Sequence, residues 1–470
     1  MKYKEEVMIL KKYIGDKAFY KAALAVALPM IIQNTFTNLV NLLDNIMVGK
    51  LVEEAMSGVA IVNQFIFVFN LAIFGAISGA GIFTAQFNGN GDIHGVKNTM
   101  RLKLLTCLVL GIAGIIIFSS FDDLLINSFL HESDSEGDLA LTLQLGKDYL
   151  TYILIGLVPF AISQAYSSTM RETGDTIVPM IASVASVITN FVLNAILIFG
   201  LLGAPALGVV GAAIATSTSR FVELGILVVW SHTHKEKYRF IKNLYTRFVI
   251  PFSLFKQVAI KGMPILFNEL FWSLSVTIKN QCFSTRGLDV VTATNIAFTL
   301  QNLLSVAYFA LSSAIAIMVG NLLGAGKLEE ARDTDRKLLA FAVFTGGIMM
   351  CIQICLAPIF PAIYDDASNS AKDLATFIMV CYGLSMPLAA LATSTYYTIR
   401  SGGLVFITML FDSVYAWVLV TPVAALLAYF TNIPFTAMLP IVIIVENIKL
   451  VPGLILVNKG IWLKQITAKE

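Results

Sequence analysis

Long runs of apolar residues dominate the chain, and short polar or glycine-containing segments separate them. Each run exceeds the ~20 residues that an α-helix needs to cross the ~30 Å hydrocarbon core of a bilayer. We therefore predict twelve membrane-spanning helices, at residues 20–48, 56–84, 97–121, 145–169, 176–200, 208–231, 258–285, 290–323, 337–361, 372–399, 404–429 and 434–458.

The composition agrees with this pattern. Hydrophobic residues make up 57% of the 470 residues and charged residues only 13%, against about 25% charged residues in a soluble domain. The formal net charge of +2 gives no indication of nucleic acid as a partner. The chain is therefore expected to be an all-α integral membrane protein in a lipid bilayer.

Lys and Arg are concentrated in alternate connections between the predicted helices. They gather in the N-terminal arm, in the segments 97–103, 235–261 and 327–337, and after the last helix, whereas the connection 122–138 is acidic. Basic loops stay on the cytoplasmic side of a membrane, and these basic segments all fall on one side when twelve helices are threaded. This pattern places both termini in the cytoplasm.

The second half of the sequence repeats features of the first half. Residues 85–99 match residues 320–334 at a displacement of 235, which aligns a Gly-x-Gly in each segment. Further along, residues 170–174 match residues 399–403 at a displacement of 229. Two halves with the same orientation are expected to be related by an axis along the membrane normal.

The repeat predicts two pseudo-symmetric six-helix lobes around a central cavity. The N-terminal lobe would span 1–231 and the C-terminal lobe 258–470, joined by a cytoplasmic linker at 232–257. Two such lobes that rock around a cleft have the geometry of a secondary transporter with alternating access.

One acidic residue interrupts the first predicted helix. Asp44 lies in an apolar stretch, and a carboxylate in hydrocarbon costs at least ~2.5 kcal/mol, so we interpret it as a functional residue. Asn34, Asn38, Asn41 and Asn45 share one helical face that Asp44 flanks, which indicates a cavity-lining stripe. The alternative is that these amides hold neighbouring helices together.

Two asparagines on another predicted helix are candidate partners for Asp44. Asn190 and Asn194 lie one turn apart on the helix at 176–200 and could reach the carboxylate, or they could serve only helix packing. A buried carboxylate that binds a proton or Na⁺ in exchange for a cationic ligand can couple an ion gradient to export. We therefore assign these three residues, together with Glu269 of the second lobe, to ion or proton coupling, with Na⁺ a possible ligand of Asp44.

The repeat assigns different chemistry to the second lobe. At the displacement of 235, Asn34 corresponds to Glu269 and Asp44 corresponds to Lys279. Glu269 is a second acid in an apolar setting, and Lys279 either pairs across helices or reaches toward the outer surface. The aromatic side chains beside them would suit planar organic cations, although aromatic residues in a bundle also pack or face lipid. The expected cavity residues of this lobe are Phe271, Trp272 and Lys279.

Two further pairs of charges lie in predicted helices. Arg220 and Glu223 are spaced i, i+3, as are Glu446 and Lys449. Pairing within one helix lowers the cost of insertion, so we interpret both pairs as mainly structural.

Sequence motifs of enzymes are missing from the chain. We find no phosphate-binding loop, no Gly-x-Ser-x-Gly nucleophile motif and no cluster with metal-ligand spacing. We therefore expect no enzymatic activity and no cofactor, with Na⁺ or H⁺ as the only ion involved.

Several motifs together resemble one known family. They are Leu28-Pro29 with Asp44–Gly49, Arg171–Pro179, Leu207–Thr216 and Gly320–Gly326. In these motifs, along nearly its whole length, the chain resembles the multidrug and toxic compound extrusion (MATE) transporters of the bacterial NorM-like and DinF-like branches.

The resemblance implies twelve helices in two lobes and export of organic compounds driven by Na⁺ or H⁺. Asp44 matches the coupling aspartate of the first helix, Asn190 an asparagine of the same network, and Glu269 a cation-binding glutamate of NorM-like members. Asn194 stands where DinF-like members have a second aspartate. The helix 10 acid of NorM-like members has no counterpart among residues 388–391.

The resulting hypothesis is a monomeric antiporter of the bacterial inner membrane that exports small organic, cationic compounds. The alternative is a flippase of the same superfamily for lipid-linked substrates, which should have a basic cavity for phosphates. A channel would need a filter-like repeat, which the sequence lacks.

Overall fold

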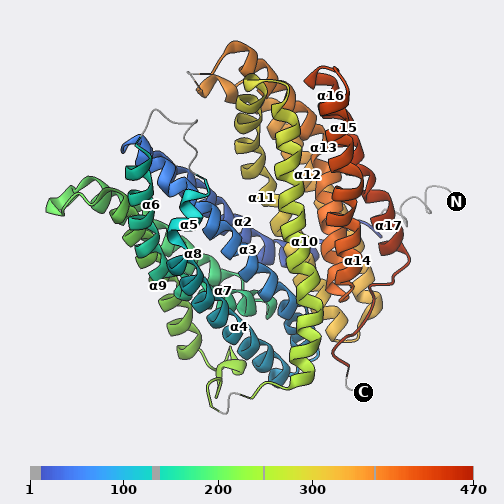
Figure 1. Ribbon diagram of the computed structural model, residues 1–470. Helices are drawn as coiled ribbons and strands as arrows, with labels where there is room; N and C mark the ends of the chain where they lie inside the picture. The colour runs from blue at the N-terminus through green and yellow to red at the C-terminus, as the bar shows by residue number, and fades with distance from the viewer. Residues whose placement is uncertain (1–11, 130–137, 247–248, 365–366, 469–470) are drawn as a thin grey trace. The chain divides into compact units, whose positions relative to one another are not determined.

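The fold is described from a computed structural model that places residues 12–129, 138–246, 249–364 and 367–468 (Figure 1). Every regular element in these segments is a helix. The α-helices are α2 Lys17–Val48, α3 Glu53–Gly89, α4 Ile93–Ser120, α5 Asp122–Asn127, α6 Leu139–Ile153, α7 Leu157–Glu172, α8 Ile177–Phe199, α9 Gly208–Thr233, α10 Phe252–Ser284, α11 Leu288–Gly324, α12 Leu328–Leu356, α13 Asn369–Ser401, α14 Val405–Met409, α15 Thr421–Phe430, α16 Phe435–Ile448 and α17 Leu450–Asn458.

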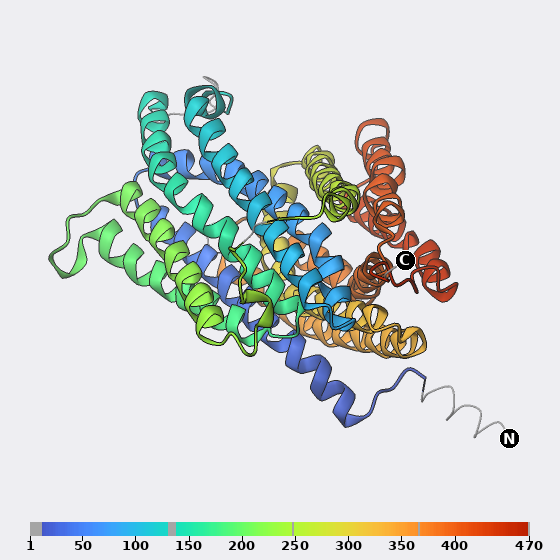
Figure 2. The same cartoon turned by 90° about the horizontal axis from the view of Figure 1, so that it is seen from below.

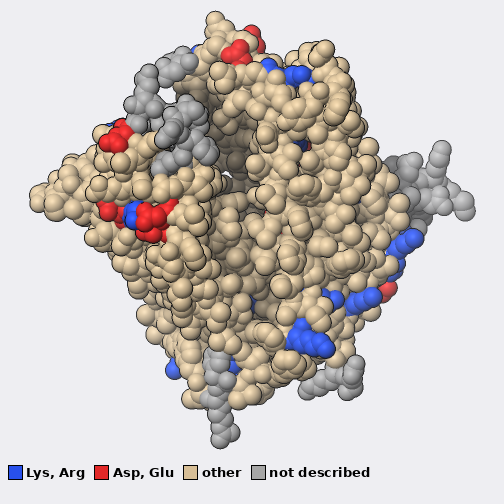
Figure 3. Space-filling view, viewed as in Figure 1, with Lys and Arg blue, Asp and Glu red and all other residues tan. Residues whose placement is uncertain are grey.

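The predicted all-helical membrane architecture is confirmed. Within the described segments, eleven helical stretches are long and apolar enough to cross a membrane. The remaining predicted span, 258–285, lies in α10, whose 33 residues are long enough but include Glu269 and Lys279. Lys, Arg, Asp and Glu occupy little of the face shown in Figure 3, as expected for a surface that meets lipid.

Helix boundaries reproduce the internal repeat. The helices α2, α3 and α4 begin at Lys17, Glu53 and Ile93, and α10, α11 and α12 each begin 235 residues later. Since each pair of helices starts at matching positions, the sequence displacement corresponds to a structural duplication.

The helices pack into two compact units. The N-terminal unit comprises Ile32–Thr84 and Ile93–Ala259, and the C-terminal unit comprises the residues up to Ile31, Ala85–Asp92 and Ile260–Glu470. The start of α2 and the end of α3 therefore pack with the second half of the chain. The division into lobes at 231 and 258 stays a prediction.

In the N-terminal unit, α4 packs on α7 and α8 packs on α9 (Figures 1 and 2). The predicted span 145–169 is not one regular helix, because a 3₁₀ turn at Leu154–Gly156 separates α6 from α7. Ser217 Oγ of α9 donates to the Tyr152 carbonyl at 2.7 Å, and a Cβ at Gly156 would lie 3.1 Å from the Ser217 Cα. The break thus lets α9 approach closely and brings α7 beside it.

In the C-terminal unit, α11, α12 and α13 pack against one another (Figure 1). Ala23 and Ala27 of α2 are fully buried in the same core as Leu311, Ala314 and Leu338. The predicted span 404–429 contains two π-helical segments, Leu410–Val414 and Ala416–Val420. Such wide turns are rare and often occur at functional sites.

The two Gly-x-Gly segments of the repeat form a close helix crossing in the C-terminal unit. A Cβ at Gly89 would overlap the Asn321 carbonyl, and a Cβ at Gly324 would overlap the Gln86 carbonyl. Asn88 Nδ2 donates to Asn321 Oδ1 at 2.6 Å beside this crossing. The glycines therefore let backbone meet backbone where α3 and α11 end.

Substitution of Gly89 by Ala is expected to destabilise the C-terminal unit by at least ~2 kcal/mol, because the obstructing atoms belong to a backbone. The matched control is Gly347→Ala in α12, where a Cβ meets no atom within 4 Å. Thermal unfolding in detergent should show a lowered midpoint for the first variant only. Equal midpoints would contradict the proposed close crossing.

The predicted linker is folded against the N-terminal unit. Arg101 of α4 donates to the carbonyls of Leu244, Asn243 and Thr246 at 2.8–2.9 Å. Asp175 caps α8 by accepting from the backbone N–H of Ile177 at 3.1 Å. The contacts of Arg101 fasten the segment after α9 to α4, and Asp175 lies at the start of α8.

Asp175 also holds the linker through its side chain. Lys237 Nζ and Tyr238 Oη each donate to Asp175 Oδ2 at 2.5 Å. Burial alone would raise the pKa of Asp175, but these hydrogen bonds outweigh burial and lower the pKa below its usual value. A lowered carboxyl pKa stabilises the docked segment at every pH above about 4 and loses this effect as the pH falls through the lowered value.

Asp175→Asn is expected to weaken docking of residues 238–246 by about 1–3 kcal/mol at neutral pH, since two donors lose a charged acceptor. Hydrogen exchange of these amides should accelerate. Glu236→Gln is the control, because the exposed Glu236–Lys242 pair contributes little. Unchanged exchange in Asp175→Asn would show that the segment is held by other contacts.

Candidate functional site

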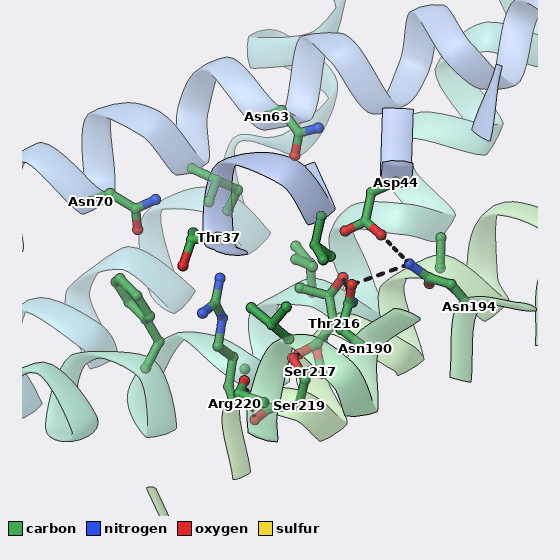
Figure 4. A pocket seen from close by; sticks show the side chains of 18 of the residues that line it. Thr37, Asp44, Asn63, Asn70, Asn190, Asn194, Thr216, Ser217, Ser219 and Arg220 are labelled. Carbon is green, nitrogen blue, oxygen red and sulfur yellow. Dashed lines mark hydrogen bonds between the residues drawn. The ribbon is translucent and has the colours of Figure 1, made fainter. Parts of the chain in front are cut away.

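A cavity of about 360 Å³ lies within the N-terminal unit, between α2, α3, α6, α7, α8 and α9. This volume falls in the range of about 300–1,000 Å³ that is typical of ligand pockets. Its principal polar side chains are Thr37, Asp44, Asn63, Asn70, Asn190 and Arg220 (Figure 4).

The carboxylate of Asp44 is held by two amides of α8. Asn194 Nδ2 donates to Asp44 Oδ1 at 2.6 Å (Figure 4). With the Asn190 nitrogen facing Asp44, Asn190 donates to both carboxylate oxygens at 2.9 and 3.0 Å and accepts from Thr216 Oγ1 at 3.1 Å. The structure thus brings together Asp44, Asn190 and Asn194, three of the four residues that the sequence assigned to coupling, and Glu269 is not among the residues that line this cavity.

These partners can adapt to either charge state of Asp44. An ionised carboxylate only accepts, so both amide nitrogens face it, whereas a protonated carboxyl also donates and needs an oxygen opposite. If the Asn190 amide turns, its oxygen supplies that acceptor and its nitrogen donates to Thr216 Oγ1 at 3.1 Å. Because the Thr216 hydroxyl can donate or accept, neither state leaves this group unsatisfied.

An oxygen beside Asp44 also suits a small cation. Asn194 is buried, and its Oδ1 has no hydrogen-bond partner among the described residues. Hard cations prefer carboxylate and carbonyl oxygens as ligands. Asp44 and Asn194 could therefore contribute to a Na⁺ site as well as to a proton site.

Helical spacing decides which face of α2 lines the cavity. Thr37, Val40, Asp44 and Val48 recur at three- and four-residue intervals and all line it. The predicted asparagine stripe lies about a quarter of a turn away on the same helix. Asn34 is half-buried, Asn38 is exposed, and the side chain of Asn41 lies outside the described part. Their role in a substrate cavity stays a prediction.

Arg220 contributes a positive charge to the same cavity. Its guanidinium points into the pocket (Figure 4), and its Cζ lies 4.8 Å from the centroid of the Phe160 ring. The predicted pairing with Glu223 is present, with Nη1 3.5 Å from Oε2. Glu223 is buried, whereas the Arg220 side chain is 34% exposed and lines the cavity. Arg220 therefore faces the cavity as well as its partner Glu223.

The C-terminal unit has its own charged cluster. Lys279 Nζ lies 3.1 Å from Glu446 Oε2, and Lys449 Nζ lies 2.7 Å from Asp412 Oδ1. The predicted pairing of Glu446 with Lys449 within one helix is therefore wrong, because each side chain turns to a partner on another helix. Asp412 belongs to the first π-helical segment, and its other oxygen accepts from Asn268 Nδ2 at 3.2 Å.

This cluster is the structural counterpart of the N-terminal cavity. The displacement of 235 relates Thr37 and Asp44 to Trp272 and Lys279, and the displacement of 229 relates Ser186, Ser217 and Arg220 to their counterparts. Those counterparts are Tyr415, Glu446 and Lys449. All five of the C-terminal residues line one small cavity of about 10 Å³.

Side-chain size explains the difference between the two cavities. In the C-terminal unit, Trp272 and Tyr415 occupy the positions that Thr37 and Ser186 have in the N-terminal unit. These larger side chains fill most of the space that is open in the N-terminal cavity. About 10 Å³ holds one water molecule at most. The charges of the filled copy are neutralised by ion pairs. In the open copy, Asp44 forms its hydrogen bonds with neutral amides, and Arg220, which pairs with Glu223, lines the same cavity.

The remaining predicted site residues lie elsewhere in α10. Glu269 is half-buried beside Asn268, the residue that binds Asp412. Phe271 is exposed and stacks on Phe267 at 6.2 Å, and its carbonyl accepts from Trp417 Nε1 at 2.8 Å. The structure does not bring Glu269 or Phe271 to the N-terminal cavity.

Sequence reasoning missed several lining residues. Asn63 and Asn70 are seven residues apart in an apolar helix, and Thr216 and Arg220 are four apart, so each pair shares a helical face. This spacing of polar side chains was the available signal. It does not reveal which face meets α2.

Comparisons with known proteins agree with the duplicated fold. The model of the MatE family matches residues 29–196 and again residues 264–431. A probable multidrug resistance protein NorM of Thermotoga maritima is 30% identical over 349 residues, 72% of this chain and 72% of that protein. The multidrug resistance protein MdtK of Yersinia enterocolitica is 24% identical over 81% of this chain and 79% of that protein.

The fold has close counterparts among solved structures. An outward-facing multidrug resistance transporter of the MATE family superposes with a TM-score of 0.82 at 20% identity, covering 96% of this chain and 98% of that chain. The double match to one family model, together with the relative at 30% identity, shows that this chain belongs to the MatE family of multidrug efflux transporters.

Proposed function

We propose that this protein is an antiporter that exports small, positively charged organic compounds in exchange for Na⁺ or H⁺. Asp44 is the coupling residue, and Asn190 and Asn194 adjust to its change of charge. Export proceeds by alternating access. The protein works as a monomer in the bacterial inner membrane, with both termini in the cytoplasm.

One observation carries this proposal. Asp44 lies in a ligand-sized cavity, and its hydrogen-bond donors are the neutral amides of Asn190 and Asn194. A carboxylate with neutral partners in a low-dielectric setting gains much from a bound cation, a proton or a cationic cargo. Since these ligands compete for one charge, entry of the ion favours release of the cargo, which is the thermodynamic basis of antiport.

The C-terminal copy of the site supports a single coupling centre. Lys279 occupies the position of Asp44 and pairs with Glu446, so a tethered ammonium group stands where the N-terminal unit can bind a mobile cation. We therefore propose that the coupling ion acts in the N-terminal unit.

The experiment is dye efflux from proteoliposomes with an imposed gradient. Three sets of vesicles receive a Na⁺ gradient, a pH gradient or neither, and a fluorescent organic cation is followed across the membrane. Efflux driven by one gradient and abolished by the matching ionophore is expected. Dye movement that is equal in all three sets would contradict coupling.

A further inference from the structure

Two sets of basic side chains at the same end of the C-terminal unit differ in their partners. At the start of α12, three of them pair with acids of their own helix at 2.5–3.6 Å, and these pairs are Lys327 with Glu330, Arg332 with Glu329 and Lys337 with Asp333. At the start of α2 and after α17, four lysines are exposed and form no ion pair with any described residue. We call this second set the basic patch, and it consists of Lys17, Lys21, Lys459 and Lys464.

The basic patch surrounds one buried core. Ala23, Val457 and Trp462 are buried in the same cluster, and each lies two residues from a lysine of the patch. Side chains two residues apart on a helix point in nearly opposite directions, so the lysines of α2 and α17 point away from that core. The start of α12 lies beside the patch, because Lys337 Nζ is 5.7 Å from the centroid of the Phe19 ring. Figure 3 shows basic side chains gathered around the end of α17, with little Asp or Glu among them.

Exposed apolar side chains continue the basic patch along both helices. On α2, the exposed face contains Lys17, Lys21, Leu24 and Leu28. On α17 and its end, the exposed face contains Val451, Ile455 and Lys459. A helix face that changes from apolar to basic is typical of the boundary between hydrocarbon and lipid headgroups. The patch therefore lies at headgroup depth, on the side of the membrane that the proposed topology places in the cytoplasm.

We propose that the basic patch binds the headgroups of anionic phospholipids in the cytoplasmic leaflet. Phosphate oxygens accept hydrogen bonds from ammonium groups, and the negative charge of these lipids supplies the counter-charge that no described residue provides. The neighbouring acid, Asp16, has a different partner, because its Oδ1 accepts from the backbone N–H of Phe19 at 2.7 Å and caps α2. A soluble polyanion fits the patch less well, since Leu24 and Ile455 extend the same faces into the membrane.

Each of the two segments contributes two lysines to the patch. Bound lipids therefore hold the start of α2 and the segment after α17 together at the membrane surface. This role is separate from the proposed exchange at Asp44, which lies near the other end of α2.

The test titrates phosphatidylglycerol or phosphatidylcholine into the full-length protein in detergent and measures bound lipid by native mass spectrometry. The two lipids share a phosphate, but only phosphatidylglycerol has a net negative charge. The main variant combines Lys17→Gln, Lys21→Gln, Lys459→Gln and Lys464→Gln. The matched control changes the net charge equally at four paired residues, and it combines Lys242→Gln, Lys327→Gln, Arg332→Gln and Lys337→Gln.

Wild type is expected to bind phosphatidylglycerol at least about tenfold more tightly than phosphatidylcholine, since each basic residue near an anionic surface contributes about fivefold. The patch variant should lose this preference, and the control should keep it. Equal affinities of wild type for the two lipids, or an equal loss of preference in the control, would overturn the inference.

A second measurement uses wild-type protein alone. Raising the ionic strength from about 0.1 M to about 1 M shortens the Debye length from about 10 Å to about 3 Å. Binding of phosphatidylglycerol should weaken severalfold, whereas binding of phosphatidylcholine should change little. Binding of phosphatidylglycerol that does not respond to salt would also overturn the inference. Neither measurement involves dye efflux, so a failure here leaves the proposed antiport function untouched.

Discussion

Asp44→Asn is expected to reduce gradient-driven efflux to the level of protein-free vesicles while the protein still folds and inserts. Asparagine has nearly the same shape as aspartate, and its amide can bond to the neutral side chains of Asn190 and Asn194. What it lacks is the charge that the ion and the cargo exchange. The substitution thus separates coupling from folding.

The measurement compares dye efflux with the amount of folded protein in the same vesicles. Asp123→Asn is the matched control, because that acid pairs with Lys147 at an exposed position away from the cavity. Its efflux should equal that of wild type. If Asp44→Asn exported dye at the wild-type rate, Asp44 would not be the coupling residue.

Glu446→Gln is expected to have the largest effect on stability. Lys279 is buried, with 7% of its side chain exposed, and its ion pair with Glu446 would be lost. Removing one partner of a buried pair leaves an uncompensated charge and costs about 3–5 kcal/mol. The unfolding midpoint in detergent should fall accordingly.

The double variant Lys279→Gln with Glu446→Gln should recover most of that loss, since it leaves no unpaired charge. It should also retain gradient-driven efflux, because in this account the small C-terminal cavity stabilises the fold and binds neither the coupling ion nor the cargo. A double variant that is as stable as wild type but transports nothing would show that these charges take part in coupling.

Local patterns in the sequence were sufficient to predict the helices and their duplication. Hydrophobic runs marked the eleven helical stretches of the described segments that could cross a membrane, and the twelfth predicted span coincides with α10. The displacement of 235 reappears in the first residues of α2 and α10. The sequence also offered Asn190 and Asn194 as possible partners of Asp44, because polar side chains in a membrane-spanning helix face the interior of the bundle or a cavity rather than lipid.

Partner choice among buried charges was not predictable in the same way. Spacing along α16 and its continuation suggested a pair between Glu446 and Lys449, yet Lys449 binds Asp412 on another segment. Likewise, Lys103 belongs to a basic stretch of sequence but is buried in an ion pair with Glu172. Such pairs depend on which helices meet, and a single sequence does not contain that information.

Cavity size was equally hidden from the sequence. Thr37 and Trp272 hold equivalent positions in the repeat, but only the packed structure shows that one copy is open and the other filled. The broken span at Leu154–Gly156 is another case, because it depends on the approach of Ser217 from α9.

The most direct test reverses the coupling. Vesicles are loaded with a cargo dye and placed in dye-free buffer with equal Na⁺ and pH on both sides, and ion entry is recorded with a Na⁺ or pH indicator. If Asp44 exchanges an ion for cargo, outward dye flow must drive inward ion flow in wild type and none in Asp44→Asn. Ion entry that persists in Asp44→Asn would contradict the account.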